Sequence, residues 1–284
     1  MTRRSCGAAL LLVLWLIALL TALVGAFALI ARMEAVQGRV AGRGAVAQEV
    51  ARAGIEYALV RLADRNPETR WVADGRPYAW SFDGAEVQVQ AIDETGKVDL
   101  NQADAVLLSR LMQVLGQPPE VGDALAAAIL DWRDGDALSQ PVGGAEDDDY
   151  AAAGRDYGAK DAPFESIAEL EQVLGMTPAL YARLAPYLTL HSGRAQPDAV
   201  YAQAPVLLAM GLDAEAWLAQ RQATSAAGNP QLVATGSGTY SIESRARLAD
   251  GQEAVLRAVV RAGAGPVPGS AYTSLRWEEG ASPQ

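Results

Sequence analysis

The longest apolar stretch of the chain lies near its N-terminus, where no residue from Cys6 to Ala31 carries a formal charge. As an α-helix, residues 8–31 would be about 36 Å long, which is enough to cross a bilayer core with some tilt. Arg3 and Arg4 precede this stretch, and positive residues stay on the cytoplasmic side of a membrane. We therefore predict one membrane-spanning helix over residues 8–31, a cytoplasmic N-terminus and a periplasmic body.

Beyond the membrane segment, apolar residues recur at three- and four-residue steps from Val36 to Leu62, as they do on one face of a helix. This spacing predicts that the helix continues through residues 32–66 in the periplasm and ends at Asn66-Pro67. Each glycine in such a helix costs about 1 kcal/mol relative to alanine. Bending or fraying is therefore expected at Gly38, Gly42 and Gly44.

Two pairs of alternating apolar and polar runs predict β-hairpins. Residues 78–82 and 85–92 flank Asp83-Gly84, and residues 239–248 and 253–261 flank a turn that contains Asp250-Gly251. Asp-Gly between alternating runs is a strong hairpin signal. We expect one small antiparallel sheet, with its first strands in residues 71–96 and its last strands in residues 239–284.

The segment between the hairpins, residues 97–225, has helical periodicity instead, with candidate helices at 102–115, 121–132, 166–174 and 178–184. Residues 226–238 predict a flexible linker. The predicted fold class is α+β: a long N-terminal α-helix packed on a small antiparallel sheet, interrupted by a large helical insertion of SAM-like or helix-hairpin-helix-like type.

Composition and charge narrow the classes of function. About half of the 284 residues are apolar, so a packed fold is expected. The formal net charge of -11 repels phosphate and disfavours non-specific binding to nucleic acid. Cys6 is the single cysteine, so no intrachain disulfide can form, and folding must depend on packing or on metal.

The segment 98–103, followed by an apolar helix, is similar to the helix-hairpin-helix units that bind DNA backbones. Such units need basic residues around the loop, and here the nearby charges are Asp99, Asp104 and Glu120 against Arg110. DNA binding is thus an alternative, and we favour a surface for protein partners. His191, the single histidine, has no nucleophile constellation around it, and no spacing selects a carboxylate pair, so no enzymatic activity is expected.

An acidic cluster follows the second candidate helix. Its acidic residues form two groups, one within residues 131–136 and one at residues 146–149. Glycines and a proline lie in the loop between the two groups and allow it to bring them together. Carboxylate oxygens without nearby cysteine or histidine favour Ca²⁺ over zinc or copper, and the other interpretation is a solvated acidic loop. The candidate calcium ligands are Asp131, Asp134, Asp136, Glu146, Asp147 and Asp148.

The N-terminus allows two kinds of processing. An ordinary signal peptide could be cut after Ala28, which would leave a mature chain that starts at Leu29. The short basic leader that ends in glycine, with the apolar helix directly behind it, instead resembles a type IV prepilin, with residues 1–7 as leader and a cut between Gly7 and Ala8. Pilins and pseudopilins mostly have glutamate at the fifth mature position, which is Leu12 here.

The order of elements, together with four sequence runs, resembles the K family of minor pseudopilins of bacterial type II secretion systems. The runs are residues 93–101, 128–136, 144–150 and 162–170. This family characteristically lacks the glutamate that Leu12 replaces. Residues 196–212 depart further from its pattern.

The resemblance implies a non-enzymatic subunit in the inner membrane, cut by prepilin peptidase, with the methylation typical of this class. It implies a place at the pseudopilus tip, where the subunit joins minor pseudopilins I and J, and H, to initiate or cap the filament. Contact with the secretin or with cargo is a further expectation. The family is also understood to bind calcium in its helical domain, which favours the calcium interpretation of the acidic cluster.

Overall fold

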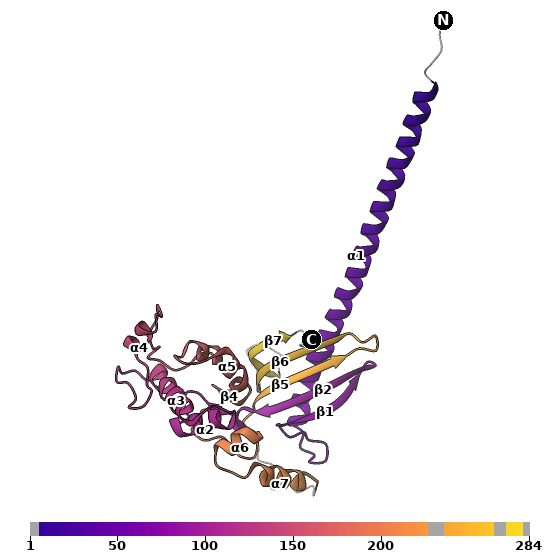
Figure 1. Cartoon of the computed structure of the whole chain (residues 1–284). Helices are drawn as coiled ribbons and strands as arrows, with labels where there is room; N and C mark the ends of the chain where they lie inside the picture. Colours follow the sequence, from indigo (N-terminus) through magenta and orange to yellow (C-terminus); the bar gives the residue numbers. More distant parts are fainter. Residues whose placement is uncertain (1–5, 227–235, 264–270, 281–284) are drawn as a thin grey trace.

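The computed structural model describes residues 6–226, 236–263 and 271–280 (Figure 1). A long N-terminal helix packs on a five-stranded sheet, and a mainly helical segment lies between the second and third strands of that sheet in order. Figure 1 shows this segment beside the sheet, while the N-terminal half of the long helix projects away from both. The predicted mixed class, with a long helix on an antiparallel sheet, is confirmed.

Helix α1 (Cys6–Leu62) contains 57 residues and is continuous through Gly38, Gly42 and Gly44. The fraying predicted at these glycines does not occur. The lower helix propensity of a few isolated glycines does not outweigh the backbone hydrogen bonds that the helix forms on both sides of them. In the part of the chain that the structure describes, α1 is the one helix long and apolar enough to cross a membrane. It ends four residues before Asn66.

The sheet has the order β1-β2-β5-β6-β7, and every pairing in it is antiparallel. Strands β1 (Asp74–Phe82) and β2 (Ala85–Asp93) form the first predicted hairpin, whose turn residues Asp83 and Gly84 both have positive φ. Strands β5 (Thr239–Arg247) and β6 (Glu253–Ala262) form the second. Strand β7 (Tyr272–Gly280) completes the sheet.

Small residues allow α1 to approach the sheet closely. Ala47, Ala51 and Ala58 are fully buried against inward-facing residues of β2, β5 and β6. Gly54 lies at the closest approach, because a Cβ there would overlap Ser244 Oγ and lie 2.9 Å from Val87 Cγ1. The helix therefore needs glycine at position 54 for packing, which is not so at Gly38, Gly42 and Gly44, where an added Cβ would meet no atom within 4 Å.

The described residues between β2 and β5 form six α-helices and several short elements. These are η1 (Glu94–Gly96), β3 (Val98–Asp99), α2 (Ala105–Val114), α3 (Pro119–Arg133), α4 (Asp147–Ala152), η2 (Ile167–Gln172), α5 (Pro178–Leu184), η3 (Ala185–Tyr187), β4 (Leu188–Thr189), α6 (Ala204–Ala209) and α7 (Ala214–Ala226). Strands β3 and β4 form a two-residue parallel pair. The expected helix at 166–174 is a shorter 3₁₀ helix, which begins at a capping box formed by Ser166 and Glu169.

Two separate apolar cores result. One contains α1 and the five-stranded sheet, and the other contains residues of the helical segment from Val98 to Ala214. The predicted linker, residues 226–238, begins at the last residue of α7, and its residues 227–235 lie outside the described part of the chain.

Candidate functional site

The acidic cluster forms where the end of α3 meets the start of α4. Asp131 lies in the last turn of α3, Asp134 caps that helix, and Glu146 is the N-cap of α4. Each offers a carboxylate oxygen, and these oxygens lie within 4.8 Å of one another. The structure thus brings together three of the six predicted ligands.

Backbone amides of the intervening loop hold Asp131 in place. Gln140 N donates to both carboxylate oxygens at 3.2 Å, and Ala145 N donates to Oδ2 at 2.7 Å. Gly144 passes so close that a Cβ would overlap Asp131 Oδ2 and the Gln140 amide. The glycine between the two acidic groups therefore allows the loop to close tightly on a buried carboxylate.

The cluster concentrates negative charge away from water. Burial and then the charges of Asp131, Asp134, Asp161 and Asp136 raise the pKa of Glu146 to about 7. Burial, followed by the same kind of repulsion, also raises the pKa of Asp134. Among the described residues, Asp134 Oδ1 and Glu146 Oε1 are buried without a hydrogen-bond partner. These are hard oxygen donors placed as a divalent cation would require.

The other predicted ligands lie outside this triad. Asp136 is exposed and accepts a hydrogen bond from Leu138 N at 3.0 Å, although its charge still acts on the triad. Asp147 and Asp148 are exposed in the first turn of α4, where Asp147 Oδ1 accepts from Ala159 N at 3.1 Å. Because successive helical residues point in different directions, only the N-cap residue Glu146 faces the cluster.

The sequence analysis missed Asp161. Its charge acts on both Asp134 and Glu146 from a segment that follows α4, and its φ is 53°. A left-handed backbone at a non-glycine residue is uncommon and is more frequent at aspartate than at most other residues. A lone aspartate before Ala162-Pro163 offered no pattern by which it could be assigned to the cluster.

A second group of buried charges joins the sheet to the helical segment. Glu94 is 1% exposed and forms an ion pair with Lys97 at 2.8 Å, and both side chains bond to Ser241 of β5 at 2.5 Å. Thr189 of β4 also donates to the Glu94 carboxylate. Burial alone would raise the pKa of Glu94, but Lys97 and the two hydroxyl donors together outweigh it and hold the pKa below its ordinary value.

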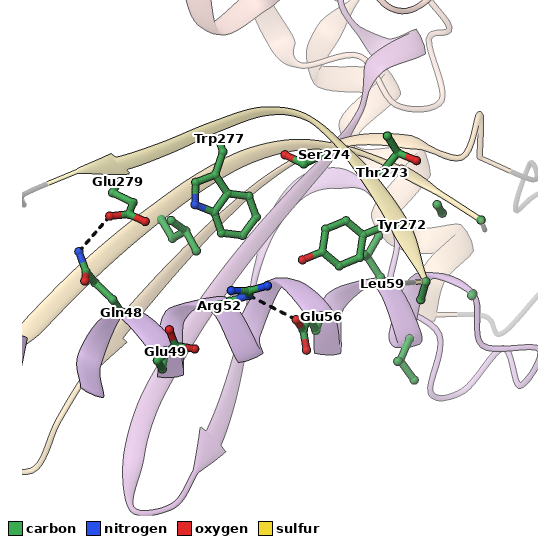
Figure 2. Close-up of a pocket in the computed structure, with 16 residues that line it drawn as sticks. Gln48, Glu49, Arg52, Glu56, Leu59, Tyr272, Thr273, Ser274, Trp277 and Glu279 are labelled. Carbon is green, nitrogen blue, oxygen red and sulfur yellow. Dashed lines mark hydrogen bonds and ion pairs between the residues drawn. The ribbon is translucent and has the colours of Figure 1, made fainter. Parts of the chain in front are cut away.

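A groove lies between α1 and the edge strand β7 (Figure 2), with a volume of about 1160 Å³. Gln48, Glu49, Arg52 and Glu56 line it from α1, and Tyr272, Trp277 and Glu279 line it from β7. The Arg52 guanidinium lies 5.8 Å from the centre of the Trp277 ring and pairs with Glu56 at 3.6 Å. Gln48 Nε2 donates to Glu279 Oε2 at 3.4 Å.

The predicted processing residues, Gly7 and Ala8, lie in the first turn of α1. His191 is half-buried in the turn after β4, and its backbone amide donates to Thr189 Oγ1 at 2.9 Å.

Comparison with known proteins places the sequence similarity mainly in the helical segment. The sequence model of the family "Type II secretion system (T2SS), protein K" matches residues 87–193. Type II secretion system protein K of Pseudomonas aeruginosa is 32% identical over 137 residues, which are 45% of this chain and 41% of that protein. The Klebsiella pneumoniae protein of the same name is 36% identical over 121 residues, or 41% of this chain and 36% of the relative.

A chain of the crystal structure of the GspK-GspI-GspJ complex from enterotoxigenic Escherichia coli has a similar fold. The TM-score is 0.58 at 20% sequence identity, and the match covers 89% of this chain and 99% of the other. The aligned parts span less than half the length of the two protein K sequences, whereas the fold similarity extends over most of the chain. The chain is therefore similar to type II secretion system protein K, as its sequence predicted, and residues 87–193 carry the protein K match.

Proposed function

We propose that the chain is a non-enzymatic minor pseudopilin of a type II secretion system. The observation that carries this proposal is the protein K match over residues 87–193, within a chain that resembles, over 89% of its length, the fold of one chain of the GspK-GspI-GspJ complex. The alternatives, a DNA-binding protein and a periplasmic protein with an ordinary signal peptide, have no support in these matches.

The apolar part of α1 suits an anchor in the inner membrane. Its side chains from Leu10 to Ile30 are exposed, including Trp15 and Phe27 at 74% and 75%, as expected of a segment that lipid covers. In this proposal prepilin peptidase cuts between Gly7 and Ala8, residues 8–31 stay in the membrane and the rest of the chain is periplasmic.

N-terminal sequencing of the chain from a membrane fraction tests this proposal. A mature chain that starts at Ala8 supports pseudopilin processing. A mature chain that starts at Leu29 would have lost most of the anchor and would contradict it.

The proposed partners are pseudopilins I and J, since the similar fold comes from a complex named for K, I and J subunits. Assembly with them would place the helical segment at the pseudopilus tip. At the tip no neighbouring amino terminus needs a carboxylate partner, so Leu12 can stand where most pilins have glutamate. Contact with H, the secretin or cargo would follow from that position. Co-purification of the full chain with I- and J-like subunits from the same bacterium tests the assignment. Failure to form any such complex would refute it.

We also propose that Asp131, Asp134 and Glu146 bind Ca²⁺, with Asp136 and Asp161 close enough to add negative charge. The residues fit such an ion, because two buried carboxylate oxygens lack hydrogen-bond partners among the described residues and every donor is oxygen. When bound, the ion would offset the repulsion among these carboxylates and tie the loop between α3 and α4 to both helices.

Calorimetric titration of the full chain in detergent, after chelation, tests the calcium site. Binding to the folded state should also raise the melting temperature as the Ca²⁺ concentration increases. If Ca²⁺ gave no heat of binding and no change in melting temperature, the proposal would be refuted. A parallel gel shift at low salt should show no retardation of DNA.

A further inference from the structure

The sheet ends in an open edge beside the α1–β7 groove. Among the strands that the structure describes, β7 pairs only with β6. A strand edge with free backbone groups is a ready place for another chain to pair. Figure 2 shows β7 passing over α1, with Trp277 and Tyr272 pointing toward the helix.

The groove exists because α1 packs mainly on other strands. Its buried face contacts β5, β6 and β2, and Trp277 and Tyr272 on β7 are only partly buried. Val60 of α1, which lines the same groove, is 65% exposed. A segment that pairs with β7 could place its inward side chains on these apolar surfaces and remove them from water.

The charges that line the groove select the kind of segment. The lining contains three carboxylates, those of Glu49, Glu56 and Glu279, and one guanidinium, that of Arg52. Arg52 already pairs with Glu56, whereas Glu49 and Glu279 lie at one end of the groove beside Gln48 (Figure 2). The hydrogen bond from Gln48 to Glu279 is long, at 3.4 Å. A lysine or arginine of an incoming segment could bind Glu279 in place of Gln48 and would be attracted to the carboxylates of both Glu49 and Glu279.

We propose that this groove receives an extended, basic segment of an I- or J-like pseudopilin, which pairs with the free edge of β7 and places a basic side chain between Glu49 and Glu279. The proposal rests on the proposed function, because it assigns a surface to the partners proposed there. It also gives the acidic end of the groove a role in choosing the partner.

Charge reversal at the groove tests this assignment. Full-length Glu49→Lys, Glu279→Lys and the double variant are purified in detergent, and binding to the purified I- and J-like subunits of the same bacterium is measured by biolayer interferometry. Glu86→Lys is the matched control: it makes the same change of charge on an exposed residue of β2, on the face of the sheet that points away from α1. The melting temperature of each variant checks that it is folded.

The double variant should bind at least one of the two partners about tenfold more weakly or worse, with faster dissociation, while Glu86→Lys binds like the wild type. Higher salt should weaken the wild type more than the double variant. Equal binding by the wild type and the double variant would overturn the groove assignment and leave the proposed function standing. No binding of either partner by the wild type would overturn both. Loss of self-association alone, with partner binding unchanged, would make the groove a contact between copies of this chain and would also overturn the proposal.

Discussion

Replacement of Gly54 by alanine tests the close contact between α1 and the sheet. Alanine should stabilise the helix itself by about 1 kcal/mol. The added Cβ, however, would overlap Ser244 Oγ and lie 2.9 Å from Val87 Cγ1, and both neighbours are almost fully buried. Overpacking at such a site costs up to about 3 kcal/mol. We expect Gly54→Ala to lower the free energy of unfolding by about 2 kcal/mol.

A double-mutant cycle separates the two contacts. Ser244 Oγ is buried without a hydrogen-bond partner among the described residues, so Ser244→Ala alone should be nearly neutral. It removes one overlap and leaves the contact with Val87, and the double variant should therefore recover about 1 kcal/mol of the loss.

Urea denaturation of the full chain in detergent, followed by tryptophan fluorescence, measures these differences, since Trp71 belongs to the same core. If Gly54→Ala were as stable as the wild type, and the cycle showed no coupling, α1 would not approach β5 as closely as described.

Three further outcomes are expected. Glu94→Gln should cost about 3 kcal/mol at pH 7, because it leaves Lys97 buried without its partner. Since the folded-state pKa of Glu94 is depressed, its contribution is present above the ordinary glutamate pKa and is lost as the pH falls through the folded-state value. Urea titrations should therefore show the variant approaching the wild type in acid, and an unchanged gap would contradict this. Asp131→Asn should weaken Ca²⁺ binding about tenfold or more in calorimetry, whereas the exposed control Asp148→Asn should not; equal effects would argue against the triad. Gly7→Val should block removal of residues 1–7, measured by the mass of the membrane-bound chain, and normal cleavage would contradict a prepilin site.

The sequence predicted best those elements whose pattern is local. Helical spacing indicated α1 to within four residues of its end at Leu62, and Asp83-Gly84 marked the turn between β1 and β2 because both positions need positive φ. The small strands β3 and β4 were not predicted, since each has two residues and its partner lies 90 residues away in the chain. Strand β7 was not separated from the C-terminal tail, because its alternation of partly buried and exposed residues covers only positions 273–278 and none of its residues is fully buried.

The gathering of acidic residues after α3 was predictable from the sequence, but only some of the residues that take part were. A run of acids around a glycine-containing loop indicated oxygen ligands, and Asp131, Asp134 and Glu146 do come together. Asp147 and Asp148 follow Glu146 directly in sequence, but the helix that starts there turns them toward solvent. Asp161 approaches from the other side through the path of the backbone after α4, which no spacing rule describes.

The insertion of the helical segment between β2 and β5 has a consequence for modularity. The chain leaves the sheet at Asp93 and returns at Tyr240, and these two residues are register partners on adjacent strands. The insert therefore begins and ends at one point, and the strand register does not depend on its length. Proteins with this architecture can enlarge, shorten or exchange the inserted segment while the scaffold of α1 and the five-stranded sheet stays the same.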